Sequence, residues 1–127
     1  MEKSPIIELR GVAKYYGTTA ALHNINLEIA NGEFLTLLGP SGCGKTTILR
    51  LISGFESPSK GELLLNGEDI TATPPEKRQV NTVFQNYALF PHMTVWDNVA
   101  FGLKMQKIGK HEMSGRVAEV LRRVHLD

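Results

Sequence analysis

Several features that would place the chain in a specialised class of protein are scarce or missing. With a single cysteine, Cys43, it can form no internal disulfide, which fits a reducing compartment. Its net charge of +1 gives no strong attraction to nucleic acid or to an anionic membrane surface. No apolar run approaches the roughly 18 residues that a membrane-spanning helix needs, and no charged-then-apolar leader opens the sequence. These absences predict a soluble cytoplasmic protein but leave its function open.

The residues that are present fit one modest globular domain. The chain has 127 residues, of which 42% are hydrophobic and 21% charged, a balance that argues against disorder. Apolar alternation predicts strands over 6–16 and 21–29, and a short strand before the turn pair Asn66-Gly67. Two further strands are predicted at 34–38 and 80–84. The first of these is a nearly continuous apolar run, which suits a strand covered on both faces in a parallel sheet.

Helical spacing of apolar residues predicts three helices. The first covers 46–55, with Ile48, Leu49, Leu51 and Ile52 as its apolar residues and Gly54 as a stop. The second covers 94–105 and begins at a possible N-cap, Thr94. The third covers 112–124.

A glycine-rich turn separates the 34–38 run from the first helix. Residues 39–46, GPSGCGKT, fit the pattern G-x-x-x-x-G-K-[ST], the Walker A motif, in the strand–loop–helix context that the motif requires. Side chains alone cannot closely surround a triphosphate, whereas backbone N–H groups can if glycines leave the approach open. The start of a helix adds unpaired N–H groups and a favourable dipole. The pattern therefore predicts a phosphate-binding loop.

Two side chains of this loop carry most of the expected chemistry. Lys45 is a point charge suited to the β- and γ-phosphates, and the Thr46 hydroxyl is placed to ligate Mg²⁺. We therefore expect ATP and Mg²⁺ as cofactors. Cys43 has no partnered base and is interpreted as a loop residue, not as a nucleophile. The predicted nucleotide-binding residues of the loop are Gly39, Pro40, Ser41, Gly42, Cys43, Gly44, Lys45, Thr46 and Thr47.

Two longer stretches resemble one protein family. Residues 31–70, NGEFLTLLGPSGCGKTTILRLISGFESPSKGELLLNGEDI, closely resemble the nucleotide-binding domain of ABC transporters, and residues 83–104, VFQNYALFPHMTVWDNVAFGLK, resemble that family's Q-loop region. Residues 78–107 are most similar to the ATPase subunits of polyamine (spermidine/putrescine) importers. The ATPase subunits of maltose, iron or sulfate importers share much of the same sequence. The resemblance implies an α/β P-loop NTPase fold, with an N-terminal antiparallel β subdomain and the start of a helical subdomain.

The resemblance also implies roles for residues outside the loop. Tyr16, in KYYG, matches the family's A-loop aromatic, which stacks on adenine; Tyr15 is the neighbouring alternative, and a structural tyrosine at a strand end is another. Gln85 matches the Q-loop glutamine, whose amide oxygen reaches Mg²⁺ or the attacking water. Lys45 and Gln85 are thus the expected catalytic residues, and Thr46 and Gln85 the expected Mg²⁺ ligands.

The same resemblance implies an assembly on a membrane. Transmembrane permease subunits and a second, head-to-tail copy of the ATPase subunit are expected partners, with a solute-binding protein involved indirectly and no nucleic acid. The expected location is the cytoplasmic face of the cell membrane, as a peripheral subunit. Residues 86–105 would lie beside the permeases. Their apolar residues, interpreted either as docking or as core residues, are Tyr87, Leu89, Phe90, Met93 and Trp96.

The later motifs of the family do not occur in these residues. There is no LSGGQ-type signature, no switch histidine, and no apolar strand ending in Asp-Glu to match Walker B. Glu68 and Asp69 come too soon after the loop and follow the Asn66-Gly67 turn. We therefore expect 1–127 to be the N-terminal part of a nucleotide-binding domain, which binds nucleotide weakly without turnover by itself. A soluble ABC ATPase with a non-membrane partner and a non-catalytic nucleotide-binding module stay open as alternatives.

Overall fold

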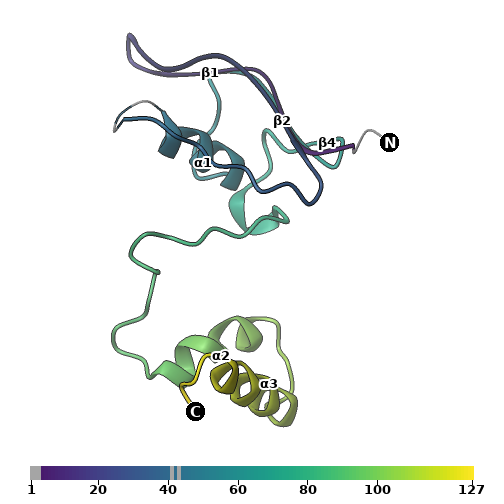
Figure 1. Cartoon of the computed structure of the whole chain (residues 1–127), viewed down its shortest axis with the longest axis vertical. Helices are drawn as coiled ribbons and strands as arrows, with labels where there is room; N and C mark the ends of the chain where they lie inside the picture. The colour runs from purple at the N-terminus through teal and green to yellow at the C-terminus, as the bar shows by residue number, and fades with distance from the viewer. Residues whose placement is uncertain (1–3, 41, 43) are drawn as a thin grey trace. The chain divides into compact units, whose positions relative to one another are not determined.

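The computed structural model describes residues 4–40, 42 and 44–127, and these form two compact units that divide between Thr82 and Val83. Figure 1 traces the chain from the strands of the first unit to the helices of the second. Each unit has a hydrophobic core of its own. The two units are therefore described separately.

The first unit is built on a four-stranded antiparallel sheet with strand order β2-β1-β3-β4. β1 and β2 form a long hairpin in which Tyr16 lies opposite Thr19 at the turn. The predicted strands at 6–16 and 21–29 are confirmed and are slightly longer than expected. The strands are β1 (Pro5–Tyr16), β2 (Thr19–Ala30), β3 (Lys60–Leu65) and β4 (Glu68–Asp69).

The turn between β3 and β4 has the conformation that its sequence predicts. Asn66 and Gly67 both adopt positive φ, 51° and 81°, and Leu65 pairs with Glu68 across the turn. Two successive left-handed residues match the twist of flanking antiparallel strands, which is why Asn-Gly is favoured there.

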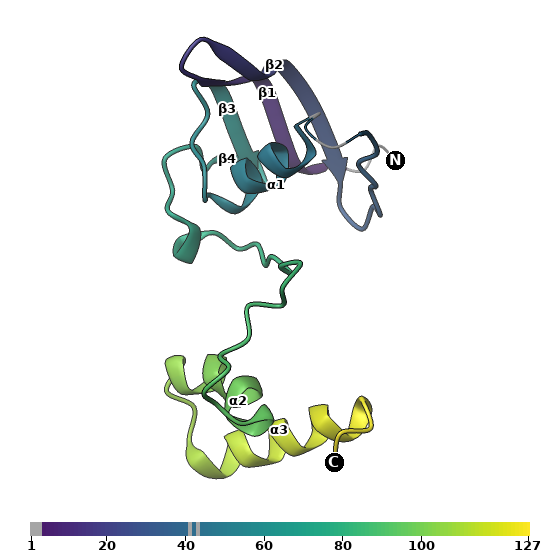
Figure 2. The ribbon, with the colours of Figure 1, turned by 90° about the vertical axis from the view of Figure 1, so that its left-hand side faces the viewer.

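Helix α1 (Lys45–Ser53) covers one face of this sheet, as Figure 2 shows. Leu51 is fully buried in the core of the unit, and Ile48 and Ile52 pack against that core. Leu49, expected with them, instead lies on the outer side and is more than half exposed. The helix ends at Gly54 as predicted: this residue adopts φ 89°, and its N–H donates to the carbonyls of Arg50 and Leu51.

Arg78 is the best-buried cation among the described residues of the first unit, and it holds the end of α1 in place. Its guanidinium donates to the carbonyls of Leu51 (2.7 Å) and Ile52 (3.2 Å), and to those of Thr71 and Thr73 beyond β4. Burial lowers the pKa of Arg78, but four accepting carbonyls compensate the charge. The short helix η1 (Pro75–Lys77) leads directly into this residue.

The strands predicted at 34–38 and 80–84 are wrong for this structure. Neither segment forms a strand, and Phe34, Leu38 and Val83 are 95%, 89% and 87% exposed. A strand needs a neighbour to receive its ladder hydrogen bonds, and no strand among the described residues pairs with either segment. The apolar residues of these two segments are therefore left exposed in this structure.

The second unit is a pair of packed helices, α2 (Val95–Met105) and α3 (Lys110–Arg123). Ala100, Val117 and Leu121 form its buried core. The predicted cap of α2 is confirmed, because the Thr94 hydroxyl accepts from the Asp97 N–H at 3.1 Å. In the described part of the chain, no helix has the length and apolar character to cross a bilayer.

Replacing Arg78 with methionine tests its role in the fold. The variant keeps most of the apolar stem but removes the guanidinium that donates to the carbonyls of Ile52, Thr71 and Thr73. We expect the free energy of unfolding to fall by about 2–4 kcal/mol, measured by urea denaturation. Arg116→Met is the matched control, because Arg116 makes only an exposed ion pair within α3 and should cost less than about 0.5 kcal/mol. Equal effects of the two substitutions would contradict this account.

Candidate phosphate-binding site

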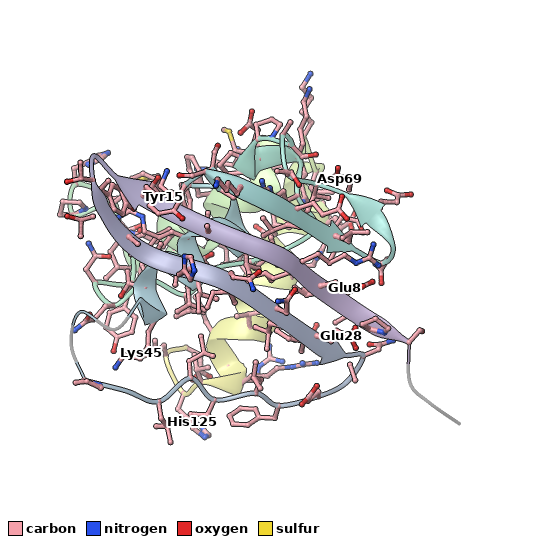
Figure 3. The ribbon with its side chains drawn as sticks, turned by 90° about the horizontal axis from the view of Figure 1, so that it is seen from above. Glu8, Tyr15, Glu28, Lys45, Asp69 and His125 are labelled. Atoms are coloured by element: carbon pink, nitrogen blue, oxygen red, sulfur yellow. The ribbon has the colours of Figure 1, made fainter. Side chains whose placement is uncertain are left out.

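A cavity of about 300 Å³ lies where the glycine loop meets the first turn of α1. Its lining combines residues of the loop and helix with one residue of the sheet, Ala21 of β2. Figure 3 shows Lys45 and Tyr15 toward the end of the β1–β2 ribbon that carries the hairpin turn. The described lining residues are Ala21, Gly42, Gly44, Lys45, Thr46 and Thr47.

Gly44 is the residue that lets the loop enter the helix so close to the sheet. Its φ of 95° is left-handed, and a Cβ added there would meet Leu22 Cδ2 at 2.7 Å and the Ala21 carbonyl oxygen at 3.1 Å. Any other residue would therefore be strained in its backbone and would push against β2. Gly44, the second glycine of the Walker A pattern, is thus required both by its left-handed backbone and by its close approach to β2.

The start of α1 presents N–H groups for which the described residues supply no acceptor. The first intrahelical bond runs from the Ile48 N–H to the Gly44 carbonyl at 3.0 Å. The N–H groups of Lys45, Thr46 and Thr47 precede it and have no acceptor within the described residues. No side chain caps this end and the first turn contains no acidic residue. Unpaired donors and the positive end of the helix dipole together favour an anion at this position.

The lysine of the loop adds a full positive charge to these donors. Lys45 Nζ donates to the carbonyl of Gly39, so its side chain reaches back across the loop to the loop's first residue. Thr46 is exposed and Thr47 half-buried beside it. An ammonium group, a hydroxyl oxygen and several N–H donors therefore converge on one cavity. This donor set fits a phosphate chain carrying Mg²⁺, whose preferred ligands are oxygens.

The remaining loop residues are partly accounted for. Gly39 and Pro40 are exposed, and Gly42 lines the cavity with a left-handed φ of 83° and no atom near the position of a Cβ. Ser41 and Cys43 lie outside the described residues. The structure therefore brings together most of the residues predicted for this loop, while their contacts with a nucleotide stay a prediction.

Tyr16 lies at the end of β1 with 49% of its surface exposed, whereas Tyr15 is half-buried. The more exposed ring is the one with room for a stacked base, which favours Tyr16 over its neighbour. The Lys14 Nζ lies 5.2 Å from the centroid of the Tyr16 ring. Lys14 also forms an ion pair with Glu56 at 3.1 Å and donates to the Ser57 carbonyl at 2.8 Å.

The ion pair of Lys14 and Glu56 was not predicted from the sequence. The hydrogen bond from Lys14 lowers the pKa of Glu56, and burial opposes this shift; the charge of Lys14, the Tyr16 hydroxyl and the charge of Arg50 lower it further. The side chains of Lys14 and Glu56 are only 15% and 25% exposed. Every other ion pair among the described residues is more exposed when the exposure of its two side chains is averaged. No motif joins these residues, because they meet only once β1 and the turn after α1 fold together. Ala21 was missed for the same reason.

Gln85 belongs to the second unit, in an exposed turn that runs from Gln85 to Ala88. The Tyr87 N–H donates to the Phe84 carbonyl at 2.9 Å, and Tyr87 and Ala88 adopt left-handed φ. The structure does not bring Gln85 together with Lys45 in one compact unit. Its role toward Mg²⁺ or water therefore stays a prediction.

The apolar residues after Gln85 divide into two groups. Phe90 is half-buried and stacks on Phe101 at 4.7 Å, and its N–H and carbonyl both bond to the Asn98 side chain. Met93 is also half-buried. Tyr87, Leu89 and Trp96 are exposed instead. The core interpretation thus suits Phe90 and Met93, and the docking interpretation suits the exposed three.

Glu68 and Asp69, set aside as a Walker B match, lie in the short strand β4. The Thr71 hydroxyl and N–H both donate to Asp69, and these two bonds lower the pKa of Asp69. Figure 3 shows Asp69 toward the end of the sheet away from Lys45. The carboxylate therefore stabilises a local turn and does not line the phosphate cavity.

Comparison with known proteins shows the family of the chain. The family described as "ABC transporter" matches residues 22–127. The chain resembles the solved dimeric structure of the ATP-binding cassette MJ0796 bound to ADP and Pi, with a TM-score of 0.79 and 30% identity over 95% of this chain and 58% of that one. The chain belongs to the ABC transporter family, and its fold is that of an ABC ATP-binding cassette.

Curated relatives narrow the resemblance further. The chain is 68% identical over 126 residues to the spermidine/putrescine import ATP-binding protein PotA of Oleidesulfovibrio alaskensis, and 66% identical over 125 residues to that of Lawsonia intracellularis. The PotA protein of Pasteurella multocida is 59% identical over 127 residues. The alignments cover 98–100% of this chain, which spans only 34% of the length of these relatives.

The Lys14–Glu56 pair predicts a specific dependence of stability on pH. Because the pKa of Glu56 is lowered in the folded chain, its stabilising contribution is complete above the unfolded carboxyl pKa of about 4.3 and is lost as the pH falls through the folded value. Glu56→Gln should therefore lower the melting temperature at pH 7, with the difference from wild type shrinking below about pH 4. Thermal denaturation across this range measures it.

The control for this pH series is Glu119→Gln, which removes one partner of an exposed ion pair in α3. Exposed pairs contribute little, so this variant should follow the wild type closely throughout. A Glu56→Gln difference that stays constant down to pH 2.5 would contradict the assignment.

Proposed function

We propose that this chain binds Mg-ATP in the cavity at the start of α1, as part of the ATPase subunit of an ABC importer for spermidine and putrescine. One observation carries the proposal: three N–H groups without an acceptor among the described residues, a left-handed glycine and the Lys45 ammonium converge on one cavity. The polyamine substrate is supported by the names of relatives that are 59–68% identical to the chain.

Different residues of the proposed site would contact different parts of the nucleotide. The N–H groups of Lys45, Thr46 and Thr47, with the loop glycines, would surround the phosphates, and the Lys45 ammonium would exchange the Gly39 carbonyl for phosphate oxygens. Thr46 and Gln85 would ligate Mg²⁺, which when bound neutralises negative charge on the phosphates. Tyr16 would stack on adenine. Gln85 would also orient the attacking water.

We propose further that residues 1–127 are the N-terminal part of a nucleotide-binding domain. The chain covers 58% of the MJ0796 cassette and 34% of the PotA relatives. Phe34, Leu38 and Val83 are large apolar residues left exposed. They are the residues that further strands of a central sheet would bury.

The assembly we propose follows from the family and from the exposed apolar residues of the second unit. Tyr87, Leu89 and Trp96 would contact transmembrane permease subunits at the cytoplasmic face of the membrane. The related MJ0796 cassette is described as dimeric, which supports a second, head-to-tail copy of this subunit. A solute-binding protein would act through the permeases and would not touch this chain.

Replacing Lys45 with alanine tests the phosphate site. The variant removes a charge-assisted contact worth about 1.5–3 kcal/mol, so the Kd for Mg-ATP should rise by about 10- to 100-fold. Isothermal titration of the chain with Mg-ATP measures this. Lys60→Ala, an exposed lysine of β3, is the control and should bind as wild type does. An unchanged affinity of the Lys45→Ala variant for Mg-ATP would contradict the proposal.

The role of Gln85 needs turnover, so its test uses protein spanning the full length of the relatives. Gln85→Ala should lower kcat for ATP hydrolysis by about 10-fold or more, because water is no longer oriented, while Kd for Mg-ATP changes by less than about 3-fold. Gln106→Ala at the end of α2 is the control. An unchanged kcat, or a loss of binding equal to that of Lys45→Ala, would remove Gln85 from the catalytic group.

A further inference from the structure

The end of β1 is linked to the turn after α1 by several contacts. The turn after α1 bonds to it three times, through Ser59 N–H to the Ala13 carbonyl (2.8 Å), Tyr15 N–H to Ser59 Oγ (3.0 Å) and Lys14 Nζ to the Ser57 carbonyl (2.8 Å). The ion pair of Lys14 with Glu56 adds a fourth link. All these contacts come immediately before Tyr16 in the chain. The backbone that carries the Tyr16 ring is therefore fixed to the segment that follows the phosphate-binding helix.

Lys14 also fixes the ring itself. Its ammonium lies over the ring of Tyr16 at 5.2 Å from the centroid, within the range of a cation–π contact. The carboxylate of Glu56 in turn holds the Lys14 ammonium at 3.1 Å. One face of the Tyr16 ring is thus occupied by the Lys14 ammonium, while about half of the residue stays exposed. A flat ligand would stack on the opposite face.

Tyr16 lies close along the β1–β2 hairpin to a residue that lines the phosphate cavity. Tyr16 pairs with Thr19, and Ala21, two residues further along β2, lines the cavity. Two residues of strand span about 7 Å, a distance that the sugar of a nucleotide can bridge. A phosphate chain at the start of α1 would therefore place its base near Tyr16.

We infer that Lys14 and Glu56 are positioning residues that hold the Tyr16 ring ready to stack on the base of the nucleotide. This inference rests on the proposed function. An ordered ring spares the cost of immobilising a side chain on binding, so the pair raises affinity for ligands with a base. The Lys14–Glu56 pair does not contribute to the binding of the phosphate groups. Lys14 and Glu56 thus act on the base-dependent part of the affinity alone.

The experiment compares two ligands that differ in the base. Mg-ATP and Mg-tripolyphosphate are titrated into the wild-type chain and into Lys14→Met, Lys14→Arg and Glu56→Gln, with Lys60→Met as the control. Lys14→Met should raise the Kd for Mg-ATP by about 3- to 10-fold and leave that for tripolyphosphate within about 2-fold. Glu56→Gln should have the same direction with a smaller effect. Lys14→Arg keeps the charge over the ring and should retain most of the affinity, and Lys60→Met should match the wild type.

A double-variant comparison separates positioning from a general structural effect. Once Tyr16 is replaced by alanine, adding Lys14→Met should weaken Mg-ATP binding no further, because no ring is left to position. The inference is overturned if Lys14→Met leaves Mg-ATP binding unchanged, weakens both ligands equally, or keeps its full effect without Tyr16. If the wild type binds neither ligand, the proposed function fails first. If Tyr16→Ala weakens Mg-ATP binding and Lys14→Met does not, the proposed function stands and this inference alone fails.

Discussion

The structure of the first unit depends on how the two ends of helix α1 are satisfied. At its C-terminal end, the Gly54 N–H donates to the carbonyls of Arg50 and Leu51, and the buried Arg78 guanidinium donates to those of Leu51 and Ile52. At its N-terminal end, the first three N–H groups have no protein acceptor among the described residues. A helix has four unpaired groups at each end, and proteins normally satisfy both ends with caps or water. Here protein groups close one end, while the other end presents unpaired donors that favour an anion.

The sheet makes this asymmetry possible because it holds the helix without covering its start. Leu51 is fully buried in the core while Thr46, one turn and a half earlier, is exposed. Gly44 lies so close to Leu22 and the Ala21 carbonyl that no side chain fits. The same strand, β2, pairs with the end of β1 that carries Tyr16. One hairpin therefore fixes both the entry of the loop and the aromatic ring beside it.

Local chemistry was predictable from the sequence wherever a single residue type satisfied a single backbone demand. Asn66-Gly67, the Gly54 stop and the Thr94 cap all appear as predicted because φ values and capping bonds are decided within a few residues. The loop was predictable because glycines, Lys45 and Thr46 must follow one another to serve one anion. Arg78 and the Lys14–Glu56 pair were not, since their partners are distant in sequence. Long side chains reveal such partners only after folding.

The two predicted strands that the structure lacks, 34–38 and 80–84, depend on partners that a local sequence pattern does not show. An apolar run records the environment in which a segment is buried, and 34–38 has the composition of a strand covered on both faces. In the first unit that segment has no partner strand among the described residues, and Phe34 is almost wholly exposed. Leu49 of α1, also exposed, lines a cavity with Leu35 and Leu37 on the helix side away from the core. The 34–38 segment therefore lies beside the outer side of α1. The helix that presents the phosphate site thus has an antiparallel sheet on one side and an apolar surface suited to further packing on the other.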